Sequence, residues 1–233
     1  MTRAWTLTVS SRRAATLWEG EAERLLALLQ AVSTSVAAEY GEPLAWRSDG
    51  MSEALWSKVD AIAAHLSQER LRDDAGAVLP RSGASSIVQG YRTSSATSVA
   101  NATFTAGASG IFPPFHCGVD FYEGATGGRF RPLPDNPVDW LVDLLLTGIT
   151  AINGTSGRIV STDLLDELID ARDGGSFEVG SVTYLPPGRD PGPLPPSLSV
   201  HHRPTGAVVV ADLHADPAAV VPDLLALDDA LRT

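Results

Sequence analysis

Cysteine, lysine and positive charge are scarce in this chain of 233 residues. Cys117 is the single cysteine, so no intramolecular disulfide can form and nothing in the sequence demands an oxidising compartment. Lys58 is the single lysine, and 17 Lys and Arg residues face 28 Asp and Glu residues, which gives a net charge of −11. Because phosphate binding needs clustered basic residues, this charge argues against nucleic acid as a partner. It suits a basic protein partner, although an acidic surface that only maintains solubility is the alternative.

Long hydrophobic runs are also missing. No run reaches the roughly 18 apolar residues that a membrane-spanning helix needs, so no membrane partner is expected. Residues 1–13 contain neither an apolar core of signal-peptide length nor a small-residue cleavage site, and we therefore expect a cytoplasmic protein. A hydrophobic content of 44% supports a sizeable core. Since no linker or internal repeat divides the chain, we predict a single domain over residues 1–233.

Helical and strand patterns can be separated in the first two thirds of the chain. Apolar residues recur every three or four positions over residues 18–40, before Gly41 and Pro43, and again over residues 51–66, which predicts two amphipathic helices. Strand patterns follow at residues 85–91, 99–105 and 118–122. We predict an α+β fold in a single domain, with a mainly antiparallel sheet and helices packed on one side.

The last third of the chain contains the strongest local pattern. Residues 176–185 are rich in β-branched and aromatic residues and predict a strand. Residues 186–204 hold seven of the 16 prolines, and because proline cannot donate to a sheet ladder, we predict an ordered surface connection there. Residues 206–212 form an apolar run that predicts a buried strand. In the terminal helix, a proline would cost about 3 kcal/mol, so we expect the regular part to begin near Pro222.

The order of these C-terminal segments carries a family resemblance. The chain reads VG-x-x-TYL at residues 179–185, then a proline-rich loop, then G-x-x-VV-x-D at residues 206–212 and DP-x-x-V from Asp216 onward. This succession of strand, loop, strand and helix resembles the bacterial immunity protein 52 family.

The N-terminal part of the chain is compatible with the same family. Trp18, Glu19 and Arg24 open the first predicted helix, and WRSDGMSEAL at residues 46–55 is similar to a family segment. The resemblance touches both ends and leaves the middle divergent. It implies a cytoplasmic antidote that binds a cognate toxin domain of a polymorphic toxin system and neutralises it by occluding its active site.

Two groups of residues offer alternative chemistry. His116 and Cys117 suggest a thiol nucleophile with a base, but adjacent residues in an extended chain point in opposite directions, so a small buried thiol is the alternative. A candidate metal site consists of His201, His202, Asp212 and His214. Its spacing matches no zinc motif such as HExxH, and surface histidines are the alternative. A small metal- or thiol-dependent enzyme and a non-catalytic scaffold of a secretion locus therefore remain alternative functions.

Aromatic and acidic residues at one predicted strand end suit protein binding. Asp120, Tyr122 and Glu123 end the third central strand, beside a glycine-rich loop that contains Arg129. Such side chains can anchor and orient a basic protein, whereas an ordinary strand end is the alternative. We predict Asp120, Tyr122, Glu123 and Arg129 as toxin-binding residues, with no catalytic residue, cofactor or metal under this hypothesis. The toxin's activity and the oligomeric state stay open.

Overall fold

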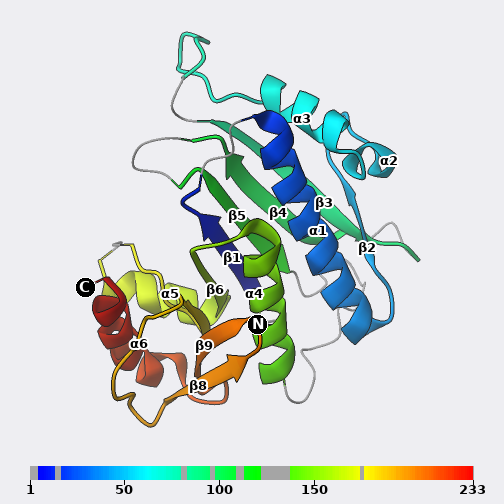
Figure 1. Cartoon of the computed structure of the whole chain (residues 1–233). Coiled ribbons are helices and arrows are strands. Elements are labelled where there is room, and N and C mark those ends of the chain that lie inside the picture. The colour runs from blue at the N-terminus through cyan, green and yellow to red at the C-terminus, as the bar shows by residue number, and fades with distance from the viewer. Residues whose placement is uncertain are drawn as a thin grey trace.

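One antiparallel sheet of nine strands organises the protein (Figure 1). The computed structural model describes residues 5–13, 17–79, 83–94, 98–108, 113–121, 137–173 and 176–232. The strands are β1 (Trp5–Ser11), β2 (Leu44–Arg47), β3 (Ala84–Arg92), β4 (Ser98–Ala106), β5 (Phe115–Phe121), β6 (Ser156–Ser161), β7 (Val182–Leu185), β8 (Leu198–Arg203) and β9 (Gly206–Ala211). Their order across the sheet is β2-β3-β4-β5-β1-β6-β7-β9-β8, with every neighbouring pair antiparallel. β2 and β8 are therefore the edge strands.

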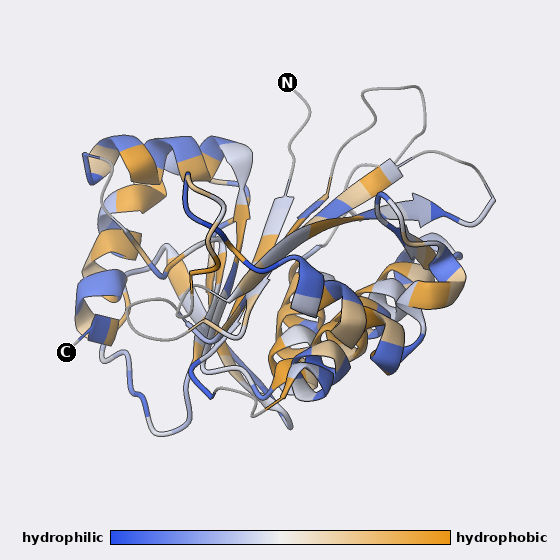
Figure 2. Ribbon diagram, turned by 90° about the horizontal axis from the view of Figure 1, so that it is seen from above, coloured by the Kyte–Doolittle hydropathy of each residue, from blue (hydrophilic) through white to orange (hydrophobic). Residues whose placement is uncertain are grey.

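Helices lie on both faces of this sheet. They are α1 (Trp18–Tyr40), α2 (Glu53–Trp56), α3 (Val59–Gln68), α4 (Val138–Ile152), α5 (Thr162–Ala171) and α6 (Pro217–Arg232). α1, α3 and α4 cover one face, while α5 and α6, near the C-terminus, lie on the other face (Figure 2). Within the described residues, no helix combines the length and apolar character that crossing a membrane requires.

The face beneath α1, α3 and α4 forms the larger hydrophobic core. Alternate residues of β1 and β4, such as Leu7 and Phe104, are completely buried there. Gly157 of β6 lets α4 approach closely, because an added Cβ would lie 2.8 Å from Ile149 Cδ1 and 3.0 Å from Leu145 Cδ1. The alternation of apolar residues in the strands therefore meets the apolar faces of the helices.

The opposite face is divided into two parts. Under α5 and α6 it is apolar, and Val160, Leu185, Val209 and Leu224 belong to a second hydrophobic cluster. Over β3, β4, β5 and β1 the residues that face this side are mostly polar and half-buried or exposed, and no described helix covers them. The described helices therefore enclose only the C-terminal half of the sheet on both sides.

The predicted α+β class with a mainly antiparallel sheet is confirmed. The expectation of helices on one side holds for the half of the sheet from β2 to β1. In the other half, α5 and α6 add a second helical layer. The reason is that β6, β7 and β9 carry apolar residues on both faces, and each face needs a cover.

Part of the proline-rich segment is a strand, contrary to the prediction of a surface connection over residues 186–204. Residues 198–203 pair with β9 as β8, in register from Leu198 opposite Ala211 to Arg203 opposite Gly206. The prolines precede this strand and follow it, and β8 lies at the sheet edge, where one side of the backbone needs no partner. The proline content therefore predicted the connection correctly but gave no indication of the strand at residues 198–203.

Two helix predictions were wrong, one in its starting residue and one in its continuity. The terminal helix begins at Pro217, five residues before Pro222, because proline suits the first helical position and the Asp216 side chain accepts the Ala218 N–H at 3.1 Å. Burial of Val220 in this early part offsets the hydrogen bond that Pro222 cannot donate. The helix predicted over residues 51–66 is divided into α2 and α3.

Candidate partner-binding face

Three neighbouring strands present nine mostly polar positions on the part of the sheet that no described helix covers on this side. Across β4, β5 and β1 the aligned rows are Asn101–Asp120–Thr6, Thr103–Gly118–Thr8 and Thr105–His116–Ser10. Directly opposed residues of antiparallel strands point to the same side, so the nine side chains form one surface. We call this surface the Gly118 face, after its central residue.

Gly118 makes the centre of this face a hollow. An added Cβ at this position would meet no atom of the described residues within 4 Å, so these residues leave the space above the backbone open. The surrounding residues, including the exposed Thr103 and the half-buried Thr8, place hydroxyl groups around it. A partner side chain can therefore approach the sheet more closely here than at any of the eight surrounding positions, which all carry side chains.

Asp120 is the predicted site residue that the structure places on this face. It is half-buried, and the hydroxyl of Thr6 on the neighbouring strand donates a hydrogen bond to its carboxylate, with Thr6 Oγ1 2.6 Å from Asp120 Oδ1. This bond orients the carboxylate and leaves its remaining acceptor capacity for another donor. Tyr122, Glu123 and Arg129, the other predicted toxin-binding residues, lie outside the described residues.

His116 and Cys117 point to opposite sides of the sheet, as the sequence predicted. Cys117 is fully buried on the helical side, where burial, with the charge of Asp120, raises its pKa to about 12. The thiolate needed for nucleophilic catalysis is therefore almost absent at neutral pH. His116 instead reaches Ser10 across the strands, with Ser10 Oγ 2.7 Å from His116 Nδ1.

The Ser10–His116 pair has part of a catalytic arrangement. Burial, and secondarily the charge of Arg158, lowers the pKa of His116, so the ring is neutral at pH 7 and can accept a proton. Within the described part of the chain no carboxylate is hydrogen-bonded to the ring, and the third group of a Ser-His-Asp triad is missing there. The bond thus fixes the orientation of His116 on the surface.

Arg158 marks the border between the Gly118 face and the region under α5 and α6. Arg158 belongs to β6 and lies opposite Thr8 of β1. Its guanidinium stacks 4.5 Å from the centre of the Phe177 ring. It also donates hydrogen bonds to the backbone carbonyls of Phe177 and Val179. Burial lowers the pKa of Arg158, and the nearby Asp228 and Glu178 partly offset this effect. Arg158 therefore holds the segment between α5 and β7 against the sheet.

The histidines of the candidate metal site are not brought together as a ligand set. His201 and His202 lie on the edge strand β8, and His201 is hydrogen-bonded to Ser199 over 3.1 Å. His214 follows β9, where its backbone N–H donates to Asp212 at 2.9 Å. Among the residues that the structure describes, no group of three or more His, Cys, Asp and Glu residues is placed to hold a metal ion.

Sequence inspection missed most of the Gly118 face. Thr6, Thr8 and Ser10 of β1 and the polar side of β4 are not among the predicted site residues. The available signal was the period of two in each segment, with polar residues or glycine between buried ones. The pairing of β1 with β5, which joins the three polar series, is a long-range contact that this period does not reveal.

Comparison with known proteins identifies a solved structure with a similar fold. No protein-family model matches the chain, and no curated protein matches it. Among solved structures, the chain is similar to the Pseudomonas aeruginosa T6SS protein PA0821, with a TM-score of 0.51 and 11% sequence identity over 99% of this chain and 72% of that one. At this identity the likeness concerns the fold alone. Membership of the immunity protein 52 family therefore stays a prediction.

Proposed function

We propose that this protein is an immunity protein that binds a cognate toxin domain of a polymorphic toxin system and neutralises it. The Gly118 face carries the proposal, because it combines an open hollow with oriented polar groups on a sheet. The sequence resemblance to the immunity protein 52 family supports the same function.

The Gly118 face has physical properties that suit a polar protein surface. Its hydroxyl, amide, imidazole and carboxylate groups supply donors and acceptors, and they stand on paired strands rather than on a loop. Two of these groups are already held, Asp120 by Thr6 and His116 by Ser10. Binding therefore requires little further ordering of the protein, which lowers the entropic cost of association.

Charge favours a basic toxin domain. The net charge of −11 attracts a positively charged partner and accelerates its association, and the effect falls with ionic strength. On the face itself, Asp120 can pair with an Arg or Lys of the toxin, while His116 is neutral at pH 7. Neutralisation by occlusion of the toxin's active site requires no catalytic group on the antidote.

The similar fold of PA0821 adds context for this proposal. That protein is named as a T6SS protein, so a fold of this kind occurs among secretion-system proteins. We place the present chain in the same setting, as the antidote of a secreted toxin, acting in the cytoplasm of the producing cell before the toxin can damage it.

Co-expression with the toxin domain encoded beside this protein tests the proposal. We expect the wild-type chain to restore growth and to form a stable complex with the toxin in size-exclusion chromatography. Gly118→Arg fills the hollow with a large cation in open space, and we expect it to fold normally but to lose the complex and the rescue.

A matched control separates this surface from a general charge effect. Ala38→Arg adds the same charge at an exposed position of α1 and should retain both complex and rescue. Absence of rescue and complex with the wild-type chain would refute the immunity function. A stable complex without rescue would instead favour a scaffold of the secretion locus.

A further inference from the structure

The surface around Gly118 continues onto β3, where it includes a large apolar side chain. Ile87 of β3 lies opposite Thr103 of β4, which itself lies opposite Gly118 of β5. Directly opposed residues of antiparallel strands point to the same side, so Ile87 belongs to the surface that contains Gly118. The Ile87 side chain is 57% exposed. A single exposed apolar residue is common on protein surfaces, so its surroundings decide what it can do.

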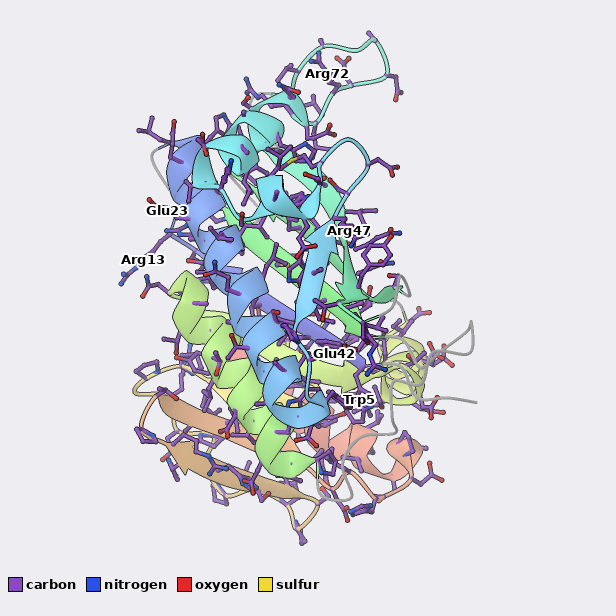
Figure 3. The ribbon with its side chains drawn as sticks, turned by 90° about the vertical axis from the view of Figure 1, so that its right-hand side faces the viewer. Trp5, Arg13, Glu23, Glu42, Arg47 and Arg72 are labelled. Carbon is purple, nitrogen blue, oxygen red and sulfur yellow. The ribbon has the colours of Figure 1, made fainter. Side chains whose placement is uncertain are left out.

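Arg47 extends this surface to the edge strand β2. It lies opposite Gln89 of β3, which is two residues from Ile87 and shares its side of the sheet. The preceding residue, Trp46, points to the other side, where its indole N–H donates to a backbone carbonyl of α1 at 3.1 Å. Figure 3 shows Arg47 at the end of β2. The Arg47 side chain therefore lies on the side of the sheet opposite α1.

An aromatic ring orients the Arg47 side chain. Its guanidinium lies 5.1 Å from the centre of the Tyr91 ring, and the Tyr91 hydroxyl donates a hydrogen bond to the side chain of Gln89. The ion-pair partner Glu53 is 3.8 Å away, and the two side chains are 49% and 57% exposed, so this pair is solvated and weak. The guanidinium is thus held in place and can still pair with another carboxylate.

We call Arg47, Ile87, Gln89 and Tyr91 the Ile87 patch. Together with the Gly118 face, this patch places opposite charges at the two ends of one cross-strand row, Arg47–Gln89–Asn101–Asp120. Neighbouring strands lie about 4.8 Å apart, so three steps separate the ends of the row by about 14 Å. This separation exceeds the screening length of about 8 Å at physiological ionic strength. The cation and the anion are therefore two independent charges on one surface.

We propose that the Ile87 patch and the Gly118 face together bind one surface of the partner. That partner surface carries an acidic, an apolar and a basic side chain, which contact Arg47, Ile87 and Asp120 respectively. The inference rests on the proposed function and specifies the chemistry of the toxin surface that the antidote recognises. Arginine and tyrosine are enriched among the residues that contribute most to binding at protein interfaces, and here they flank an exposed apolar side chain.

The two fixed charges determine the orientation of the partner, whereas the net charge does not. The net charge of −11 attracts a basic toxin domain from a distance, whichever way that domain is turned. At contact, only one orientation pairs Arg47 with an acid and Asp120 with a base. The reversed orientation brings like charges together, which is unfavourable.

Calorimetric titration of the full-length protein with the toxin domain encoded beside it tests the patch. We expect Ile87→Ala to weaken binding at least about tenfold, or about 1.4 kcal/mol. Arg47→Gln should weaken it about three- to tenfold, since it removes one partly exposed charge. The matched controls are Ile169→Ala on α5, where the side chain is 41% exposed, and Arg189→Gln in the exposed segment before β8. Both controls should bind like the wild type.

A charge exchange tests the orientation. The double variant Arg47→Asp, Asp120→Arg keeps the net charge of −11 but reverses the charges at the two ends of the row. We expect it to bind at least about tenfold more weakly than the wild type, although its long-range attraction is the same. Thermal unfolding shows whether it folds. Ile87→Ala and Arg47→Gln change exposed side chains, so they stay informative if the double variant does not fold.

The outcomes separate this inference from the proposed function. If the wild type binds the toxin and both Ile87→Ala and Arg47→Gln bind as tightly as their controls, the Ile87 patch is refuted and the immunity function stands. Undiminished binding by a folded charge-exchange variant would refute the assignment of an acid to Arg47 and a base to Asp120. If the wild type binds no toxin, the proposed function and this inference are both overturned.

Discussion

The two halves of one sheet face differ in the residues that they present. Under α5 and α6 the strands present Val160, Leu185 and Val209, which join a hydrophobic cluster with the helices. Over β4, β5 and β1 the same face presents threonines, Asn101, His116, Asp120 and a glycine. Both halves belong to one antiparallel ladder and share a helical layer on the opposite side.

Under the proposed function, this difference separates stability and recognition along the sheet. Apolar residues on both sides of β6, β7 and β9 require a second helical layer, because exposed they would not contribute hydrophobic free energy. Polar residues on one side of β1, β4 and β5 remain satisfied without such a layer. The half without described helices on its second face carries the proposed binding surface, and the following changes probe each half separately.

The largest expected effect contrasts two apolar truncations. Leu224 of α6 is completely buried in the second cluster, whereas Ile87 of β3 is 57% exposed beside the Gly118 face. Leu224→Ala should lower the free energy of unfolding by about 2–5 kcal/mol, because it leaves a cavity. Ile87→Ala should change it by less than about 0.5 kcal/mol. Urea denaturation of both variants measures the contrast, and equal effects would contradict the division of this face.

A smaller effect contrasts two strand glycines. Gly157 lies against α4, and Gly118 has open space, so the same substitution meets different surroundings. Gly157→Val should lower the free energy of unfolding by about 1–3 kcal/mol through overpacking. Gly118→Val should leave it unchanged or raise it slightly, because valine favours strands and glycine does not. Thermal unfolding reports the difference; a destabilised Gly118→Val variant would show that the hollow is occupied.

The smallest expected effect concerns pH and the Gly118 face alone. Burial lowers the pKa of His116 in the folded state below its ordinary value of 6.5, so the unfolded chain binds a proton first as the pH falls. Stability therefore decreases from about pH 6.5 downward until the folded-state pKa is passed. His116→Gln removes the titrating imidazole and should flatten that part of the curve of stability against pH. Denaturation at several values between about pH 8 and about pH 5.5 compares the variant with the wild type, which supplies the background from other groups.

Local signals in the sequence account for much of the fold. The helical period located α1 and its end at Gly41, where a left-handed φ of 83° suits glycine. Alternation located β3, β4 and β5, and an apolar run located β9. The strand β8 was missed because its propensity is masked by nearby prolines, and only pairing with β9 stabilises it. Residues 44–47 are too short to form a strand signal without β3 beside them.

One of the four predicted toxin-binding residues, Asp120, lies on the Gly118 face, and its role in binding stays a prediction. Its carboxylate accepts a hydrogen bond from Thr6. The two residues are 114 positions apart, and no local pattern relates them. The same holds for Ser10 and His116, which meet because β1 inserts between β5 and β6.

The sequence by itself determined the acidic charge, the α+β class and the alternation of apolar and polar residues in each strand, because these depend on composition and on short periods. Only the tertiary structure decided which polar series became neighbours, which half of the sheet received a second helical layer, and that Gly118 lies over open space. Those outcomes depend on contacts between distant segments, whose free energies are gained only when the whole sheet is assembled.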